Sequence, residues 1–252
     1  MEADIFNFKF CLGCLKHGRW ICDQCGRHFI PQLPMCYSCR TVSGGYITHV
    51  KCINKREYLT SLMVCFEYNR VIKRYVKYIK FKHSTVLLNE ILIIALPHIL
   101  TYIRNTQHFT RNAKECLLVP VPLYWLRYLN RGFNQSRIIA EAISKETGID
   151  INNRCLKKIR NNRPQSEVKH KNRVRNTLGA FRFNSKYISE EVKHIILVDD
   201  IVTTGATLEE CTKEIKAVRE DIQIHAIALF RPKPKVIRKK LLPVTNMHKI
   251  NP

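Results

Sequence analysis

One stretch, residues 195–207, constrains the fold of this chain more than any other part of the sequence. It reads Ile-Ile-Leu-Val-Asp-Asp-Ile-Val-Thr-Thr-Gly-Ala-Thr. The apolar, largely β-branched run from Ile195 to Val198 is typical of a strand that is buried on both faces. The stretch from Ala206 to Val218 has helical periodicity. The sequence therefore predicts a buried strand, a short polar turn and a helix, which is the repeating order of an α/β fold.

The turn between this strand and this helix has the composition of a phosphate-binding loop. Thr203, Thr204, Gly205, Ala206 and Thr207 lead into the first turn of the helix. At a helix N-terminus, backbone N–H groups without partners and the helix dipole attract anions, and threonine hydroxyls donate further hydrogen bonds. Gly205 has no Cβ, so the backbone can adopt a positive φ and approach a ligand closely. We expect these five residues to bind a phosphate group.

Two adjacent carboxylates, Asp199 and Asp200, stand where the strand is expected to end. Paired carboxylates can accept hydrogen bonds from two sugar hydroxyls, or share a Mg²⁺ ion with a diphosphate. A phosphate site beside acceptors for vicinal hydroxyls describes a ribose 5-phosphate, so the two acids are the candidate catalytic residues. The alternative is a buried strand with an acidic end before an ordinary N-capped helix. That alternative leaves three spaced threonines and a glycine unexplained.

This run closely resembles the phosphoribosyl pyrophosphate (PRPP) binding loop of type I phosphoribosyltransferases. In that family, two acids hold the ribose 2- and 3-hydroxyls, and the Thr/Gly loop holds the 5-phosphate. The resemblance implies that Asp199 and Asp200 bind the ribose, that residues 203–207 bind its phosphate, and that Mg²⁺ accompanies PRPP.

The cysteines are concentrated near the N-terminus, where seven of the 11 lie within the first 52 residues. They form three Cys-x-x-Cys pairs, and a fourth pair has histidine in its first position: Cys11 and Cys14, Cys22 and Cys25, Cys36 and Cys39, His49 and Cys52. Two ligands three residues apart converge on one ion, and tetrahedral Zn²⁺ takes two such pairs. We predict two structural zinc sites, one from the first two pairs and one from the last two. A segment this short buries too little apolar surface to fold without metal.

Two alternatives concern these sites. His49 could be a surface imidazole, which would leave a partial or three-cysteine second site, and the pairs could interleave, with the first and third sharing an ion. A redox role is disfavoured, because the flanking sequence lacks the strand and helix of a thioredoxin motif. The remaining cysteines are expected to be small buried apolar residues: Cys65, Cys116, Cys155 and Cys211.

The rest of the chain alternates between strand and helix patterns, which predicts a mostly parallel α/β sheet with flanking helices and a site at the carboxyl ends of its strands. Strands are predicted at residues 62–68, 116–121 and 222–230, and helices at 70–80, 85–103 (disturbed around Pro97) and 134–147. Apolar and aromatic residues share one face of helix 70–80, which favours a core position over contact with nucleic acid. We expect a double zinc ribbon at 1–56, a phosphoribosyltransferase-like domain at 57–231 and a loose basic tail at 232–252.

Two further motifs indicate a subfamily. Val119-Pro-Val-Pro122, followed by Asn130-Arg-Gly-Phe-Asn-Gln135, is similar to the signature of ComF/GntX-type (competence protein F family) proteins, and so is the segment from Asn162 to Phe181. These proteins carry cysteine-rich zinc ribbons before a phosphoribosyltransferase-like domain, which is the order found here. His49 stands where the family usually has a cysteine.

The resemblance implies roles for the residues after the second predicted strand. Pro120 and Val121 belong to the turn that lies against the pyrophosphate in type I transferases, and Arg127 and Arg131 become candidates to neutralise it. Residues 131–135 could equally form a helix-capping turn. The basic stretch 160–177 matches the mobile hood that closes over the substrate in such folds.

The net charge of +23 favours polyanionic partners such as nucleic acid or nucleotides. The same charge also follows from a heavy use of lysine, asparagine and isoleucine, so charge alone fixes no partner. The most apolar stretch, residues 91–100, has about half of the roughly 20 residues that a bilayer requires. Residues 1–4 do not open a signal peptide. We expect a cytoplasmic protein without a membrane span.

Two functions of different class follow. In the first, a ComF-type protein binds PRPP or a nucleotide, and acts on single-stranded DNA with the DNA-uptake machinery during natural transformation, to which family members are linked. In the second, an active phosphoribosyltransferase transfers ribose 5-phosphate to a nitrogen nucleophile in nucleotide metabolism. No segment predicts a base-selecting pocket, whereas the presence of both acids argues for a working ribose site.

Overall fold

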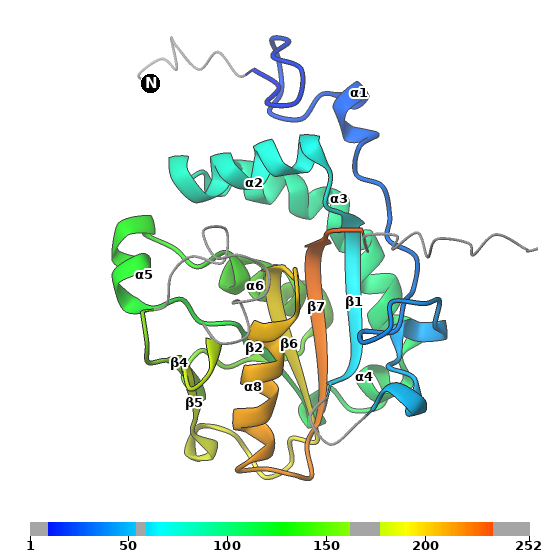
Figure 1. The fold of residues 1–252 in the computed structure, drawn as a ribbon, viewed down its shortest axis with the longest axis vertical. Coiled ribbons are helices and arrows are strands. Elements are labelled where there is room, and N and C mark those ends of the chain that lie inside the picture. Colours follow the sequence, from blue (N-terminus) through cyan, green and yellow to red (C-terminus); the bar gives the residue numbers. More distant parts are fainter. Residues whose placement is uncertain (1–9, 54–58, 162–176, 234–252) are drawn as a thin grey trace, which may run out of the picture.

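The structure is a computed structural model that describes residues 10–53, 59–161 and 177–233. Its centre is a five-stranded sheet in the order β1-β7-β6-β2-β3, in which all neighbouring strands are parallel (Figure 1). These strands are β1 (Leu59–Glu67), β7 (Gln223–Arg231), β6 (His194–Ile201), β2 (Cys116–Pro120) and β3 (Asp150–Ile151). A separate antiparallel pair is formed by β4 (Leu156–Lys158) and β5 (Phe181–Phe183). The predicted parallel α/β sheet is confirmed.

Helices cover both faces of this sheet. One face packs against α2, α3 and α6, and the other against α8 and β5, which gives two apolar cores. In Figure 1, α8 lies in front of the sheet and α6 behind it. The described α-helices are α1 (Asp23–Gly26), α2 (Arg70–Lys82), α3 (Thr85–Asn105), α4 (Gln107–Arg111), α5 (Trp125–Arg131), α6 (Gln135–Thr147) and α8 (Ala206–Lys216). Short 3₁₀ turns are η1 (Gly44–Tyr46), η2 (Val50–Cys52), η3 (Ala113–Glu115) and η5 (Ser185–Tyr187).

Strand β6 is buried on both faces, as its sequence predicted. Ile196 and Val198 belong to the core beneath α6, whereas Ile195 and Leu197 belong to the core beneath α8. Successive side chains of a strand point to opposite faces, and here both faces are covered by helices. A strand of this kind has no solvent-facing side, which explains the continuous apolar run.

The end of β6 differs from the prediction. Asp199 and Asp200 were expected to follow the strand, but β6 continues to Ile201 because Asp199 and Ile201 still pair with Ala228 and Phe230 of β7. Strand β1 likewise begins at Leu59, three residues earlier than expected. Pairing with β7 extends both strands beyond their apolar runs. The apolar pattern of each segment alone could not predict this extension, because it depends on a neighbouring strand.

Helix α2 follows its sequence pattern closely. The side chain of Asn69 accepts hydrogen bonds from the backbone N–H groups of Val71 and Ile72, both at 3.0 Å, and so caps the first turn. Its buried residues are Ile72, Tyr75, Val76 and Ile79. Tyr75, which was assigned to the core, therefore does lie there, and the exposed face carries lysine and arginine together with Phe81.

Helix α3 corrects a prediction, because it continues through Pro97 without interruption. Proline lacks the N–H that would serve the carbonyl of Ile93, but Ile93 is 72% exposed, so that carbonyl lies on the solvent side. By length and composition α3 is a helix that could cross a membrane. A buried core helix passes the same test, and α3 has eight buried residues that pack against the sheet and α6.

The sheet has a topological switch point between β2 and β6. From β2 the chain passes through α6 to β3 on one side, and from β6 it passes through α8 to β7 on the other. The two connections therefore diverge and leave a crevice at the carboxyl ends of these strands, where open α/β sheets bind ligands. The predicted phosphate loop follows β6 and the Pro-Val-Pro segment follows β2, so the fold brings both to this crevice.

Candidate functional site

Asp199 and Asp200 lie at the carboxyl end of β6, and both are half-buried. Ser136 Oγ, in the first turn of α6, donates to Asp199 Oδ1 at 3.2 Å, and the backbone N–H of Asp200 donates to the same oxygen at 2.9 Å. Burial, and then the charge of Asp200, raise the pKa of Asp199 to about 7. Two carboxylates in such a place resist ionising together, so the pair favours a cation or hydroxyl donors.

Cationic side chains surround this acid pair. Lys80 Nζ, near the end of α2, lies 2.6 Å from Asp200 Oδ2. Arg131 is close enough to Asp200 for the two charges to interact, although burial is the main influence and lowers the pKa of Arg131. Burial likewise lowers the pKa of Lys158, with Asp199 acting in the opposite direction. Of these three cations the sequence motifs indicated only Arg131, because α2 and β4 approach the acids only in the folded chain.

The predicted phosphate loop joins β6 to α8. Gly205 is the N-cap of α8 and has a φ of +95°, in the region that its sequence context predicted for a glycine. Thr204 Oγ1 accepts a hydrogen bond from the N–H of Ala206 at 3.3 Å. A small hollow lies beside the loop, and it is lined by Asp199, Ile201, Val202, Thr203, Gly205, Thr207 and Leu208. The structure therefore gathers one acid and three of the five predicted loop residues around one space.

The Pro-Val-Pro segment continues from β2 beside the carboxyl half of β6. Pro120 pairs with Val198, and the N–H of Val121 donates to the Val198 carbonyl oxygen at 2.9 Å. Both residues are buried, so they hold the carboxyl end of β2 against β6. Arg127 lies farther on in α5 and is half-buried. Contact of these residues with a pyrophosphate stays a prediction.

Residues 131–135 do form a capping turn, the alternative that the sequence left open. Gly132 ends α5 with a φ of +76°, and the side chain of Asn134 caps α6 by accepting from the N–H of Ser136 at 3.1 Å. Arg131 Nη1 donates to Gln135 Oε1 at 3.1 Å. The turn thus fixes Arg131 beside the acid pair, so capping and a binding role for Arg131 are compatible.

Gln135 is a site residue that the motifs did not assign to binding. It is buried, and its Nε2 has no hydrogen-bond partner among the described residues. Gln135 and Asp200 both line a second small hollow between α2, α6 and β7. A buried amide donor without a partner costs free energy, so a ligand oxygen there would be stabilised.

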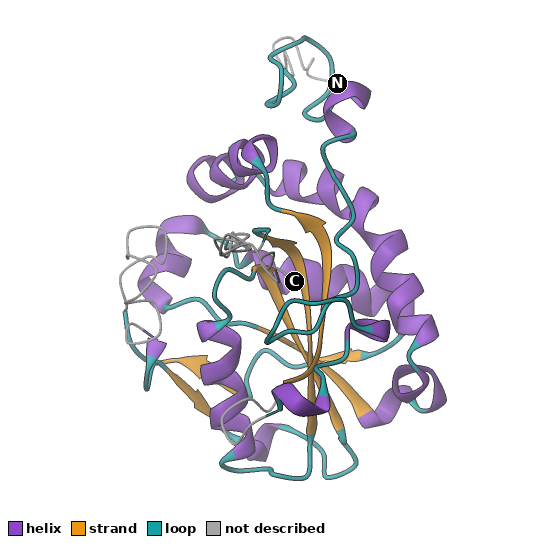
Figure 2. Ribbon diagram, turned by 45° about the vertical axis from the view of Figure 1, so that its right-hand side comes forward, coloured by secondary structure: helices purple, strands orange, loops and turns teal. Residues whose placement is uncertain are grey.

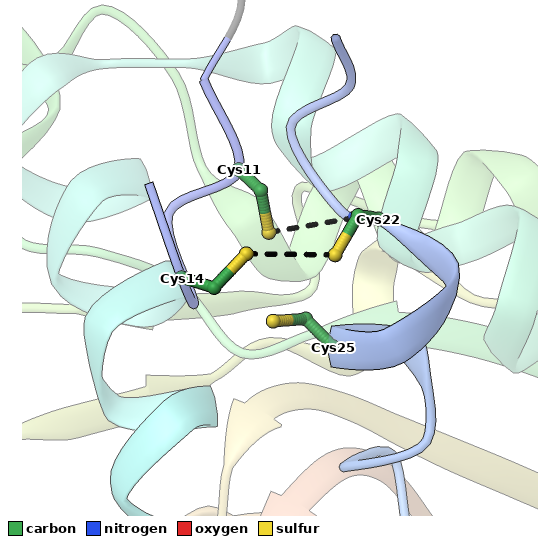
Figure 3. A group of neighbouring side chains, drawn as sticks. All are labelled: Cys11, Cys14, Cys22 and Cys25. Carbon is green, nitrogen blue, oxygen red and sulfur yellow. Dashed lines mark hydrogen bonds between the residues drawn. The ribbon is translucent and has the colours of Figure 1, made fainter. Parts of the chain in front are cut away.

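The first cysteine cluster has the predicted membership: Cys11, Cys14, Cys22 and Cys25 (Figure 3). All four sulfur atoms lie within 4.8 Å of one another, and the Sγ atoms of Cys14 and Cys22 are 3.6 Å apart. Two sulfurs bound tetrahedrally to one zinc at about 2.3 Å are about 3.8 Å apart, so the donor set fits Zn²⁺. Gly13 is required in this knuckle, because a Cβ there would lie 2.6 Å from Cys25 Sγ.

The second cluster also has the predicted membership: Cys36, Cys39, His49 and Cys52. His49 Nδ1 lies 3.5 Å from Cys39 Sγ, which places the imidazole among the sulfur atoms rather than on the surface away from them. The hydrogen bond between Cys39 and Thr41 Oγ1, at 3.0 Å, is the largest of the influences that lower the pKa of this thiol to about 6, whereas hydrogen bonding to Cys39 raises the pKa of Cys52 to about 11. The pairs do not interleave. Both donor sets fit structural metal sites.

Two remaining predictions concern other parts of the chain. The isolated cysteines are all buried, as expected: Cys65, Cys116, Cys155 and Cys211. The basic stretch 160–177 lies mostly outside the described residues, because residues 162–176 are not among them, and so does most of the predicted tail.

A parallel sheet with two acids and a Thr/Gly loop at its switch point defines a class, the phosphoribosyltransferase-like α/β domain. A family model described as "Phosphoribosyl transferase domain" matches residues 130–251. Competence protein F of Haemophilus influenzae is 25% identical over 236 residues, which cover 89% of this chain and 98% of that protein. DNA utilization protein YhgH of Escherichia coli is 25% identical over 198 residues, covering 78% of this chain and 84% of that protein.

A third similar protein is competence protein ComFC of Bacillus subtilis, which is 34% identical over 119 residues, 47% of this chain and 45% of that protein. The chain belongs to the ComF family of phosphoribosyltransferase-domain proteins, with two N-terminal four-residue clusters of cysteine and histidine. The names of its relatives link the family to competence and DNA utilization.

Proposed function

We propose that this protein binds PRPP with Mg²⁺ at the carboxyl edge of its sheet, and that it handles single-stranded DNA during DNA uptake in the cytoplasm. The observation that supports the ligand most directly is the hollow shared by Asp199 and the Thr/Gly loop at the switch point. A ribose 5-phosphate needs an anion site close to two acceptors for its hydroxyl groups. The loop offers the anion site, and the acid pair offers the acceptors.

Each part of the ligand then has a partner in the crevice. The 5-phosphate binds the N-terminus of α8, and the ribose hydroxyls donate to Asp199 and Asp200. The oxygen donors of the acid pair suit Mg²⁺, which supplies positive charge to the diphosphate when it is bound. Lys80 holds Asp200 in the free protein, and its ammonium group can move to the diphosphate when the ribose takes over that carboxylate.

The DNA role rests on the relatives and on the surface of the described residues. Competence protein F and YhgH are named for competence and DNA utilization. Helix α5 exposes Trp125 and Tyr128 beside Arg127, and α2 exposes Lys73 and Lys77. Exposed aromatic rings stack on unpaired bases, and basic side chains neutralise phosphates, so both helices suit a single strand.

Isothermal titration with PRPP and Mg²⁺ tests the ligand. Asp199→Asn combined with Asp200→Asn should weaken binding by well over tenfold, because two charge-assisted contacts contribute about 1.5–3 kcal/mol each. The matched control is Asp221→Asn, an exposed carboxylate that pairs with Arg219 away from the crevice. Equal affinities in the double variant and the control would refute the ribose assignment.

Titration with a single-stranded oligonucleotide tests the DNA role. Its affinity should fall as salt rises, with a slope of about −0.7 per phosphate contacted. Trp125→Ala with Tyr128→Ala should weaken binding by about 30-fold or more, since each of the two rings would stack on a base and stacking is worth about 1–3 kcal/mol per base. Tyr187→Ala, another exposed aromatic, is the control. If the oligonucleotide does not bind, or if both variants behave alike, the α5 surface is not a DNA site.

A second candidate function is favoured by one observation, the intact acid pair with its surrounding cations. An active transferase would use the same groups to stabilise the departing diphosphate. The test is release of pyrophosphate from PRPP in the presence of nucleobases and other nitrogen nucleophiles. Release that one acceptor stimulates, and that Asp199→Asn with Asp200→Asn abolishes, would establish turnover.

A further inference from the structure

The second metal cluster lies directly against the phosphate loop. Tyr37, between Cys36 and Cys39, is 3% exposed and belongs to the same apolar core as Val202 and Leu208. A Cβ at position 205 would lie 2.1 Å from Tyr37 Oη and 2.8 Å from Tyr37 Cε2. Gly205 therefore serves two purposes, because it permits the positive φ of the loop and leaves room for the tyrosine ring.

Tyr37 also holds a carboxylate in the first turn of α8. Its Oη donates to Glu209 Oε1 at 2.7 Å. Glu209 lies in the first turn of α8, where the helix dipole attracts any nearby negative group, including this side chain. This hydrogen bond holds the Glu209 carboxylate at the Tyr37 hydroxyl group. The carboxylate therefore does not compete with a phosphate for the backbone N–H groups of the loop.

Arg40 extends the contact to the loop backbone. Its Nη2 donates to the carbonyl oxygen of Thr203 at 2.8 Å, and burial lowers the pKa of this guanidinium. The backbone of Arg40 has a φ of +60° and is held by its N–H bond to the Cys36 carbonyl oxygen at 3.1 Å. A guanidinium presents five donors, and here one of them already reaches the loop that would bind the phosphate.

The domain holds this knuckle from its other side. Arg231, at the end of β7, donates from Nη2 to the Tyr37 carbonyl oxygen at 3.0 Å. Its guanidinium carbon lies 5.4 Å from the centroid of the Tyr37 ring. Arg231 is buried, which lowers its pKa to about 10, with the charge of Arg40 adding to that effect. The knuckle is thus enclosed by the phosphate loop and the last strand.

We propose that the second metal cluster is part of the ligand site. Its knuckle, residues 36–40, holds the phosphate loop in its binding conformation through Tyr37, and Arg40 adds positive charge for a phosphate ester. Metal binding at this cluster and phosphate-ester binding at the loop should therefore strengthen each other, since coupling between two sites is reciprocal. The identity of the ester rests on the proposed function, whereas the coupling of knuckle and loop does not.

The first experiment needs no ligand. Hydrogen exchange of the loop, residues 201–209, is compared between Cys39→Ser and Cys14→Ser, which each remove one exposed ligand from one cluster. We expect faster exchange of the loop in Cys39→Ser and unchanged exchange in Cys14→Ser. Equal exchange in the two variants would overturn the coupling, whether or not PRPP binds.

The second experiment keeps both clusters intact. Arg40→Met should weaken PRPP and ribose 5-phosphate binding by about tenfold or more, as expected for a lost charged hydrogen bond, while the zinc content is unchanged. Arg27→Met is the control, because Arg27 is an exposed arginine that follows a knuckle of the first cluster. An Arg40→Met affinity equal to that of Arg27→Met would exclude Arg40 from the site.

The third experiment tests reciprocity. The rate at which zinc passes to a coloured chelator is measured with and without PRPP and Mg²⁺, using Cys14→Ser so that only the second cluster is loaded. We expect PRPP to slow this release several-fold in Cys14→Ser and to leave the rate unchanged in Cys39→Ser. If PRPP binds but changes neither rate, the coupling fails while the proposed function stands. If PRPP does not bind at all, the proposed function fails, and the loop-exchange experiment alone decides the coupling.

Discussion

The two metal clusters of this chain have nearly the same ligand spacing but contact different parts of the domain. The first cluster packs on α2, where Tyr75 Oη lies 3.5 Å from Cys11 Sγ and Arg74 donates to the Gly13 carbonyl oxygen at 2.7 Å. The second cluster packs on the phosphate loop through Tyr37 and Arg40. Figure 2 shows the long segment that joins them, running from α1 down the molecule before β1 begins.

This difference predicts that two metal sites with similar ligand spacing have different roles. A closed site with four protein ligands stabilises its own knuckles wherever it is docked. What differs is the element that each knuckle contacts, helix α2 in one case and the predicted phosphate loop in the other. The first cluster is therefore expected to affect stability, and the second to affect both stability and binding.

Removing the metal should have the largest effect. Protein purified without chelator should contain close to two zinc ions per chain, and each structural zinc contributes about 10 kcal/mol or more to the folding of its segment. Stripping both ions should unfold residues 10–53, measured as complete hydrogen exchange there. A stoichiometry near one would show that His49 and Cys52 do not complete the second site.

The next largest effects should come from two glycine substitutions, which distinguish the role of the second cluster from that of the first. Gly205→Ala places a Cβ against Tyr37 and strains a φ of +95°, which should cost about 1–3 kcal/mol and remove PRPP binding. Gly13→Ala places a Cβ 2.6 Å from Cys25 Sγ and should loosen only the first cluster. Titration calorimetry and the rate of zinc release measure both. A loss of PRPP binding in Gly13→Ala would contradict the division of roles.

The pH dependence of PRPP affinity should distinguish the effect of the acid pair from the effects of the two clusters. Asp199 has a pKa raised to about 7, and only its carboxylate accepts a ribose hydroxyl, so PRPP affinity should fall by up to about tenfold per pH unit below 7. Because PRPP phosphates also titrate, the comparison is with Asp199→Asn, whose affinity should depend less on pH between 6 and 8.

The raised pKa of Asp199 also determines how this residue changes the free energy of unfolding with pH when no PRPP is bound. A carboxyl group with a raised folded-state pKa contributes stability that is complete below about pH 4, and that is lost as pH rises through about 7. Asp199→Asn should therefore be more stable than the parent protein at pH 8, measured by urea unfolding. A parent protein that gains stability relative to Asp199→Asn between pH 5 and 8 would contradict this assignment.

The smallest effects should come from two tyrosine hydroxyls. Tyr75→Phe removes the group beside Cys11 and should cost about 0.5–1.5 kcal/mol of unfolding free energy without changing PRPP affinity. Tyr37→Phe releases Glu209 and should weaken PRPP binding by a few-fold. Similar affinities in the two variants would show that Tyr37 acts on stability alone.

The sequence by itself determined the local units. Ligand spacing predicted the membership of both clusters, although it left an interleaved pairing open, and apolar periodicity predicted strand β6, helix α2 and helix α6. These features depend on residues within a few positions of one another, so spacing along the chain is sufficient to predict them. The strand, acid pair and Thr/Gly turn likewise predicted the phosphate loop and the positive φ of Gly205.

Only the tertiary structure decided which of these units meet. Lys80, Gln135 and Tyr37 reach the acids or the loop from elements distant in sequence, and Tyr37 and Glu209 are 172 residues apart. The extension of β6 past its acids came from pairing with β7, and the continuity of α3 through Pro97 came from a solvent-facing turn. Such contacts depend on which elements pack on each face of the sheet. That packing is a property of the whole domain, so local sequence patterns do not reveal it. Local spacing therefore identified the candidate site, whereas long-range packing assigned its neighbours.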